Sequence, residues 1–182
     1  MTDLGTIDGG TASVANGIND AGVVIGNSDT ADGGERGFID EEGTMTDVGT
    51  LGGANSLVDA INDNGVVTGS SDDASGASLP FVYSNGTMTS LGTYNIDTTP
   101  QAINDDGVIV GTTYGLNAAG DFFNDAFIYQ NGTFQDLNNL IPAGSGWELT
   151  DAVAVNDSGK ILVDGTSTIT GQDHALLLTP AN

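Results

Sequence analysis

The stretch Ile61-Asn62-Asp63-Asn64-Gly65-Val66-Val67 decides the fold, because close copies of it recur along the whole chain. Each copy places an Asn-Asp-x-Gly tetrad after Ile or Val and before a strand-like apolar run. The tetrads occupy residues 19–22, 62–65, 104–107 and 156–159. Self-similarity at this period is typical of a repeat architecture, in which each copy is one supersecondary unit. The sequence therefore predicts four copies of one repeat.

Two turn signals divide each repeat into strands. In the tetrad, the Asn side chain can hydrogen-bond its own backbone two residues on, and Gly accepts the left-handed conformation. The pairs at 85–86 and 131–132 are Asn-Gly, with Glu-Gly at 42–43, and they suit tight hairpin turns. We expect strands at about 12–18, 23–28, 37–40 and 44–49 in the first repeat, forming a four-stranded antiparallel meander.

One column of the repeat holds small residues alone, directly before the Ile or Val of the tetrad. Its members are Gly17, Ala60, Ala102 and Ala154. A small residue at a fixed place on the first strand indicates crowding, as on the innermost strands of blades that converge on an axis. Four-stranded meanders arranged radially are β-propeller blades. The predicted fold is thus all-β, a four-bladed β-propeller with four-stranded antiparallel blades.

The chain ends predict how the ring closes. Residues 1–6 match residues 45–50 at five of six positions, so the chain opens on a copy of the fourth strand, which the last repeat lacks. We expect the N-terminal strand to pair into the last blade and abolish the exposed edges. Residues 1–182 then form a single domain, with repeats at about 7–49, 50–92, 93–138 and 139–182 plus 1–6. This closure favours a monomer, although two four-repeat chains could also close one larger ring.

Charge excludes several partners. The chain of 182 residues carries 25 acidic side chains against two basic ones, a formal net charge of −23. A nucleic-acid partner is excluded because binding it needs a basic footprint. Anionic membrane surfaces are disfavoured for the same reason, and no apolar run is long enough for membrane insertion. We expect salt, calcium or another cation to stabilise the fold, as in a halophilic or marine protein.

The repeat resembles a known family. Residues 45–53 (MTDVGTLGG), 61–69 (INDNGVVTG) and 125–129 (DAFIY) are similar to the HAF family of probable extracellular repeats. The resemblance covers nearly the whole chain and implies an extracellular or cell-surface repeat array, with no reaction attached. The signature His-Ala-Phe is imperfect, since the corresponding triplets begin with Arg36, Leu79, Asp125 and His174. The chain itself begins without the basic start and apolar core of a signal peptide.

Two insertions mark the loops around the third repeat. The connection between its second and third strands has four extra residues, and the connection into the fourth repeat is also longer. Loops with exposed aromatic residues on a rigid scaffold commonly bind ligands, so we expect a glycan or protein partner here. The candidate ligand-binding residues are Tyr94, Tyr114, Phe122, Phe123 and Trp147. Alternatively, Trp147 and Phe122 fold down to cap the core.

The tetrad aspartates form a candidate cation site. Asp20, Asp63, Asp105 and Asp157 recur at one place in the repeat, and oxygen-rich groups suit calcium. The alternative is turn chemistry, because Asp is a preferred turn residue. No cofactor is required by the sequence. A Cys or paired-His metal site is excluded because the chain has no cysteine and one histidine, His174, which we expect to make a structural hydrogen bond.

The sequence singles out no catalytic residue. We therefore predict a non-enzymatic extracellular or cell-surface module for binding or display, with its ligand face around the third blade. A carboxylate-based polysaccharide hydrolase or lyase is the alternative, because acids are plentiful although no pair stands out. A purely structural repeat segment of a larger surface protein is a further alternative.

Overall fold

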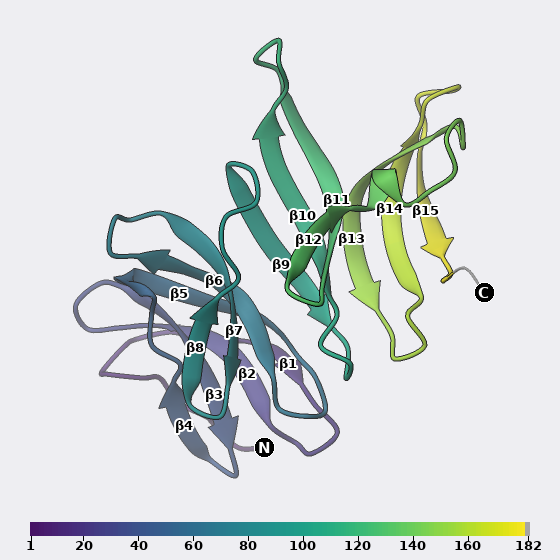
Figure 1. The fold of residues 1–182 in the computed structure, drawn as a ribbon. Helices are drawn as coiled ribbons and strands as arrows, with labels where there is room; N and C mark the ends of the chain where they lie inside the picture. The colour runs from purple at the N-terminus through teal and green to yellow at the C-terminus, as the bar shows by residue number, and fades with distance from the viewer. Residues whose placement is uncertain (181–182) are drawn as a thin grey trace. The chain divides into compact units, whose positions relative to one another are not determined.

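The computed structural model describes residues 1–180, which form an all-β protein. Within those residues, fifteen strands build four antiparallel sheets, one for each repeat (Figure 1). The chain divides into two compact units, Met1–Gly92 and Thr93–Asn182, and each unit holds two repeats. No helix in the described part of the chain is long and apolar enough to cross a membrane.

The first unit contains two four-stranded meanders. Its strands are β1 (Ser13–Ile18), β2 (Val24–Asp29), β3 (Glu35–Glu41) and β4 (Thr44–Asp47), then β5 (Gly52–Ile61), β6 (Val67–Asp73), β7 (Ser78–Ser84) and β8 (Thr87–Ser90). In both sheets the spatial order follows the chain order, β1-β2-β3-β4 and β5-β6-β7-β8. The predicted meander is confirmed in both repeats of this unit.

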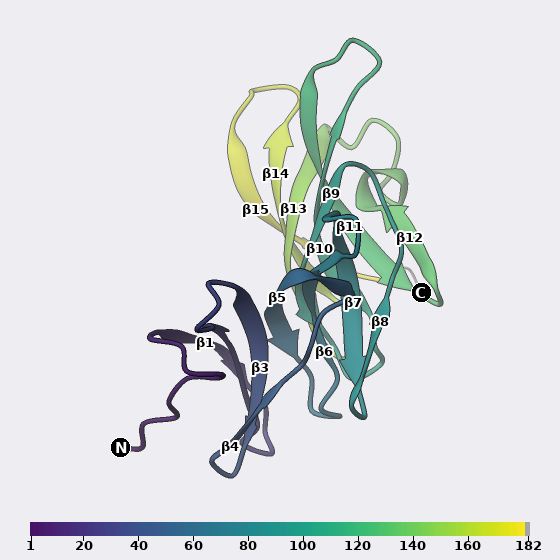
Figure 2. The ribbon, with the colours of Figure 1, turned by 90° about the vertical axis from the view of Figure 1, so that its left-hand side faces the viewer.

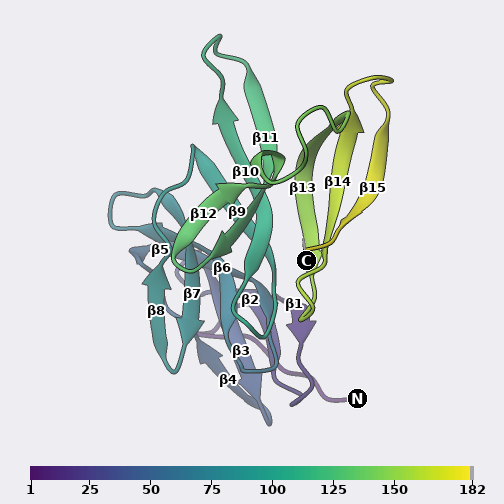
Figure 3. The same cartoon turned by 45° about the vertical axis from the view of Figure 1, so that its right-hand side comes forward.

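The second unit repeats this plan with one strand fewer. Its strands are β9 (Asp97–Ile103), β10 (Ile109–Leu116), β11 (Phe122–Gln130) and β12 (Thr133–Asp136), then, after the 3-10 helix η1 (Leu137–Asn139), β13 (Trp147–Val155), β14 (Ile161–Ser167) and β15 (Asp173–Leu178). The sheet β9–β12 has four strands, and the sheet β13-β14-β15 has three (Figure 3).

The turn chemistry is confirmed in outline and corrected in detail. Asn85 and Asn131 adopt positive φ angles of 50° and 53°, each followed by a positive-φ glycine, as a tight hairpin requires. In the tetrads, the Asn side chain reaches four residues along the backbone rather than the expected two. Asn19 Oδ1, for example, accepts the Val23 N–H at 2.9 Å, so the side chain closes the whole turn.

The cores lie between consecutive sheets, and each joins two repeats. In the first unit, Ile25 and Val48 of the first repeat pack with Val58, Val67 and Phe81 of the second. In the second unit, the corresponding core combines residues of both sheets: Val110, Ala126, Ile128 and Leu137 with Leu149, Ala152, Ile161 and Val163. A repeat therefore buries its apolar face only against a neighbour, which is how repeat arrays gain stability.

The small-residue column is as crowded as the sequence predicts. A Cβ added to Gly17 would lie 3.3 Å from the Ile25 side chain and 3.7 Å from Ile61 of the next repeat. The residue before it forms a β-bulge on the first strand of every repeat. The four bulged residues are Asn16, Asp59, Gln101 and Val153. A bulge at one fixed place twists each sheet in the same way.

The predicted seam at the N-terminus is not confirmed and stays a prediction. Residues 1–6 lie in no strand, and the last sheet of the described chain keeps three strands (Figure 2). The segment is held in its own repeat instead, because the Ser13 hydroxyl donates to Gly5 O at 2.7 Å and the Ile7 N–H donates to Ser28 Oγ at 3.2 Å. These bonds connect the N-terminal segment to the first sheet.

Candidate ligand surfaces

The insertion in the third repeat extends a hairpin instead of making a loop. Strands β10 and β11 have 8 and 9 residues, against 6 and 7 in β2 and β3 of the first repeat. The extra residues pair with one another up to Leu116 and Phe122, so the insertion projects as a two-stranded arm (Figure 1). Its tip is closed by Asn117, whose side-chain oxygen accepts the N–H groups of Ala119 and Asp121.

One face of this arm is apolar and open to solvent. Alternate residues of a strand share a face, and directly paired residues lie on the same side. Tyr114, Leu116 and the Leu116 partner Phe122 therefore lie together, and Phe122 is 84% exposed. The acids Asp97 and Asp121 flank them, the first paired with Tyr114 and the second next to Phe122. We call Tyr114, Leu116 and Phe122 the hairpin patch.

The other predicted aromatic residues do not join the hairpin patch. The Tyr94 ring stacks on Phe134, with centroids 5.0 Å apart and planes at 3°. Phe123 covers Gly115, where a Cβ would lie 2.3 Å from its ring. The Trp147 ring packs edge-on against His174 at 5.3 Å. The five predicted residues thus lie in four places, and the Trp147 and Phe123 rings pack against other residues of the chain.

His174 has a different partner from the one expected. The sequence suggested a structural hydrogen bond, and the ring instead forms the edge contact with Trp147. Both residues belong to the last sheet, since Trp147 begins β13 and His174 lies in β15. The contact holds the indole against its own sheet.

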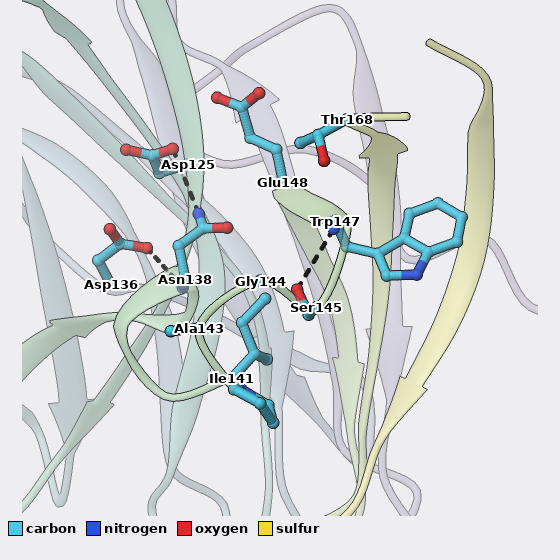
Figure 4. Close-up of a pocket in the computed structure, with 11 residues that line it drawn as sticks. Asp125, Asp136, Asn138, Ile141, Ala143, Gly144, Ser145, Trp147, Glu148 and Thr168 are labelled. Carbon is cyan, nitrogen blue, oxygen red and sulfur yellow. Dashed lines mark hydrogen bonds between the residues drawn. The ribbon is translucent and has the colours of Figure 1, made fainter. Parts of the chain in front are cut away.

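Three carboxylates line a cleft beside η1. The cleft has a volume of about 300 Å³, and Asp125, Asp136 and Glu148 share it with Asn138. Figure 4 shows the Trp147 indole pointing away from these carboxylates, toward the neighbouring strands. Among residues 1–180, no three acidic or histidine side chains are grouped closely enough to hold a metal ion, and these three are no exception.

Asn138 organises the cleft. Its Oδ1 accepts the Leu149 N–H at 2.7 Å, and its Nδ2 donates to Leu149 O at 2.9 Å and to Asp125 at 3.4 Å. Its own N–H donates to Asp136 at 2.7 Å, which caps η1. These bonds connect the end of β12 to β13 and place carboxylates from different strands around one opening.

Asp125 is the carboxyl group of the cleft whose pKa is clearly raised. Partial burial, reinforced by the negative charges of Asp136 and Glu148, raises the pKa of Asp125 to about 6. Burial also raises the pKa of Tyr94, again with a contribution from Asp136. The sequence did not single out Asp125, although it occupies the first place of the imperfect His-Ala-Phe triplet. Its position there is the one signal that could have marked it.

Asp59 is a second carboxyl group that sequence reasoning missed. It is the bulged residue of β5, and its Oδ2 is buried without a hydrogen-bond partner among the described residues. Burial raises its pKa to about 7. The equivalent Asn16 donates to Val58 O at 2.6 Å, so this place in the repeat suits a donor better than a carboxylate.

The tetrad aspartates take part in the turns. The Asp63 carboxylate accepts the N–H of Asp20 at 2.9 Å, and the Asp157 carboxylate accepts the N–H of Asp105 at the same distance. Each bond joins the turns of two consecutive repeats. Asp63 and Asp157 therefore act as hydrogen-bond acceptors between turns. Cation binding by the four tetrad aspartates stays a prediction.

Comparison with known proteins gives information about the fold and not about the function. No family model and no curated protein matches the chain. A crystal structure of TolB from Acinetobacter baumannii is similar over 93% of this chain, with a TM-score of 0.57 and 17% sequence identity. The chain spans 44% of that protein's length. The all-β, propeller-like character of the fold is therefore supported, whereas the HAF resemblance stays a prediction.

Proposed function

We propose that the chain is a non-enzymatic extracellular or cell-surface binding module, and that the hairpin patch is its ligand face. The four sheets act as four consecutive blades of a β-propeller, a scaffold that presents loops and hairpins from fixed positions. The observation that carries the proposal is the exposure of Tyr114, Leu116 and Phe122 together on an arm that the other repeats lack.

The chemistry of the hairpin patch favours a protein partner over a glycan. Aliphatic and phenyl groups clustered on one face are typical of protein hot spots, where apolar anchors enter a pocket. Tyr114 is the single phenol of the patch, and the other side chains of the patch, Leu116 and Phe122, offer no hydrogen-bonding group to a sugar. The Trp147 indole is packed against His174 and lies outside the patch. Asp97 and Asp121 flank the patch with negative charge. We therefore expect basic residues around the pocket of the partner that receives the patch.

A quantitative pull-down tests this function. The chain is immobilised and exposed to the cell-surface protein fraction of the producing organism, alongside the double variant Leu116→Ser/Phe122→Ser. We expect retention of a specific protein to fall at least about tenfold in the variant, because two exposed anchors contribute a few kcal/mol. Leu140→Ser is the matched control, since Leu140 is also exposed but lies outside the arm.

A glycan array tests whether the chain binds a glycan instead of a protein. Binding of a polysaccharide that is lost in Trp147→Ala and kept in the hairpin variant would contradict the proposed face. Equal retention of every protein by the wild type and by Leu116→Ser/Phe122→Ser would contradict it as well.

The carboxylate cleft supports a second candidate, a polysaccharide hydrolase or lyase. Asp125, with its pKa raised to about 6, is suited to hold a proton near neutral pH, and Glu148 or Asp136 would act as the ionised partner. Release of reducing ends from a polysaccharide panel measures this activity. Turnover that disappears in both Asp125→Asn and Glu148→Gln would favour the enzyme over the binding module.

A further inference from the structure

The arm of the third repeat leaves one edge of β11 without a neighbouring strand. β12 pairs with the second half of β11 alone, at Phe127–Gln130. Residues 122–125 therefore have β10 on one side and no strand on the other side within the described part of the second unit. An open strand edge of this kind is a template for pairing with another chain. We call residues 122–125 the open edge.

The backbone groups of Phe122 and Asn124 point toward the open edge. At the tip of the arm, the Asn117 N–H donates to Asp121 O at 2.9 Å, so these two residues form a hydrogen-bonded pair. Such pairs alternate along an antiparallel ladder, and the residues between them direct their N–H and C=O groups away from the partner strand. Phe122 and Asn124 lie one and three positions past Asp121, so their N–H and C=O groups face away from β10.

In the first repeat, the next repeat closes the equivalent edge. Glu35 and Asn124 both directly precede the imperfect His-Ala-Phe triplet. The Glu35 N–H donates to Asn55 Oδ1 at 3.0 Å, whereas the described second unit contains no such bond from the Asn124 N–H. The Asn124 side chain donates to Thr150 O at 3.2 Å instead. The backbone donor of Asn124 is thus available to a partner.

The open edge connects the hairpin patch with the carboxylate cleft. Phe122 begins the edge, belongs to the patch and is 84% exposed. Asp125 ends the edge and lines the cleft with Asp136 and Glu148 (Figure 4). A segment that lies along the open edge therefore contacts an apolar surface near one end and three carboxylates near the other.

We propose that a protein partner adds an extended segment to the open edge, with apolar side chains on the hairpin patch and a Lys or Arg side chain in the carboxylate cleft. This mode of contact rests on the binding function proposed above and specifies its ligand. Strand addition gains affinity from main-chain hydrogen bonds and specificity from pockets for alternate side chains. Phe122 and Asn124 supply the main-chain groups, and the patch and the cleft supply the pockets.

Charge determines which extended segment fits. The negative charges of Asp136 and Glu148 repel that of Asp125 across the cleft. The two basic residues of the sequence, Arg36 and Lys160, do not line it. A Lys or Arg side chain from the partner relieves this repulsion, whereas an acidic or uncharged segment does not. The net charge of −23 also attracts basic segments to the chain.

Peptide selection on the full chain identifies the preferred segment. A library of random peptides of about ten residues is displayed on phage and selected on the immobilised protein. We expect the recovered peptides to alternate apolar and polar residues and to carry Lys or Arg at one end. Enrichment of peptides without this pattern, or no enrichment at all, would overturn the proposal.

Two substitutions of Asn124 separate backbone pairing from side-chain contact. Asn124→Pro removes the outward N–H and no bond to β10, and proline is tolerated at such edge positions. Asn124→Ala keeps the N–H, and both variants lose the side-chain bond to Thr150 O. We expect the most enriched peptide to bind Asn124→Pro at least about tenfold more weakly than Asn124→Ala, by fluorescence anisotropy. Equal affinities would exclude strand addition.

Amide hydrogen exchange tests the same contact in the unchanged chain. At a saturating concentration of the most enriched peptide, we expect exchange of the Phe122 and Asn124 N–H groups to slow at least about tenfold, because each gains a hydrogen-bond acceptor. The Leu116 N–H is the control, since it points away from β11 on the other strand of the arm. Unchanged exchange at Phe122 and Asn124 with the peptide bound would contradict pairing at this edge.

A double-mutant cycle tests the cleft. Glu148→Gln is measured with the most enriched peptide and with a peptide in which Met replaces its Lys or Arg. We expect the substitution to weaken the basic peptide at least about threefold and to leave the Met peptide unchanged, because the pair of charges is lost in the first case alone. Equal effects on both peptides would remove the basic side chain from the cleft.

Failure of strand addition is distinguishable from failure of the proposed function. If Leu116→Ser/Phe122→Ser abolishes retention of the protein partner and Asn124→Pro retains it, the hairpin patch is a ligand face and strand addition is wrong. If neither variant changes retention, the binding function of the patch itself is wrong.

Discussion

The two compact units share one scaffold and differ in what the scaffold holds. Residues 1–92 form two regular meanders with short connections, whereas residues 93–182 contain the same meander with an extended β10–β11 arm, the helix η1 and a carboxylate cleft. The turn-to-turn hydrogen bonds have equal lengths in both units. Contacts between repeats thus build the scaffold, and additions outside those contacts create candidate sites.

The fourth repeat adds a second difference. Its second strand has Val163 where the other repeats have glycine, and its first strand has an extra register shift between Leu149 and Asp151, directly before the Val163 partner Ala152. The extra shift of β5 lies farther away along the strand, between Gly52 and Ser56. In the second repeat, a Cβ at Gly69 would lie 2.0 Å from Leu57 O, which no side chain tolerates. We infer that the extra irregularity of β13 makes room for the valine.

Gly69→Val is expected to have the largest effect. The added side chain must displace the backbone of β5, so we expect a loss of about 4 kcal/mol or more in unfolding free energy, or no folded protein. Chemical denaturation measures it. Thr89→Val is the matched control at an exposed strand position and should change the free energy by less than about 1 kcal/mol. A stable Gly69→Val protein would show that the register of β5 is as adaptable as that of β13.

Asp59→Asn is expected to have the next largest effect, and the effect depends on pH. The pKa of Asp59 is raised to about 7 in the folded chain from its usual 3.8, so stability from the protonated form is lost as pH rises toward and through 7. At pH 8 we expect the variant to be more stable by about 3 kcal/mol, and the difference to vanish near pH 4. Thermal unfolding between these pH values measures it.

A control separates this local effect from net charge. Asp106→Asn removes one negative charge from an exposed turn of the second unit. Its stability should follow the wild-type pH profile with a small uniform offset. If Asp106→Asn gives the same gain at pH 8 as Asp59→Asn, general repulsion and not burial of Asp59 causes the gain.

Asp157→Ala compared with Asp20→Ala tests the turn-to-turn bonds. In dilute, low-salt solution we expect Asp157→Ala to cost about 1 kcal/mol, because the Asp105 N–H loses its acceptor. Asp20→Ala should cost less, since within the described first unit the bond between the two turns uses the Asp20 N–H and not its carboxylate. Urea denaturation measures both. Equal costs would mean that these bonds contribute nothing beyond the local turn.

Arg36→Gln is expected to have the smallest effect. Arg36 lies 3.9 Å from the Asp47 carboxylate and donates to Ala54 O of the second repeat. The ion pair is partly exposed, so we expect a loss below about 1 kcal/mol that shrinks further in salt. A larger loss that does not depend on salt would show that the hydrogen bond to Ala54 O stabilises the chain more than the ion pair with Asp47 does.

Repetition made most of the fold predictable. The turns at Asn62 and Asn85, the strand order and the crowding at Gly17 follow from local chemistry that recurs in every copy. The seam stays a prediction, because the match of residues 1–6 to residues 45–50 says which strand they copy and not which sheet they join. Local bonds from Ser13 and Ile7 hold that segment in the first repeat.

The candidate site was less predictable. The aromatic residues expected in loops lie in four separate places, partly because pairing along β10 and β11 exposes Tyr114 and Phe122 and turns Phe123 inward. Asp59 carried no signal in the sequence, and Asp125 carried only its place in the triplet. Their raised pKa values come from burial and, for Asp125, also from carboxylates on other strands.

The repeat, the all-β class, the acidic character and the chemistry of each turn can be read from the chain, because they depend on composition or on residues close together in sequence. Which aromatic residues reach solvent and which carboxylates share a cleft emerge from the folded chain alone. Those properties arise where separate strands meet, and burial and dielectric environment are set by the neighbours that packing supplies.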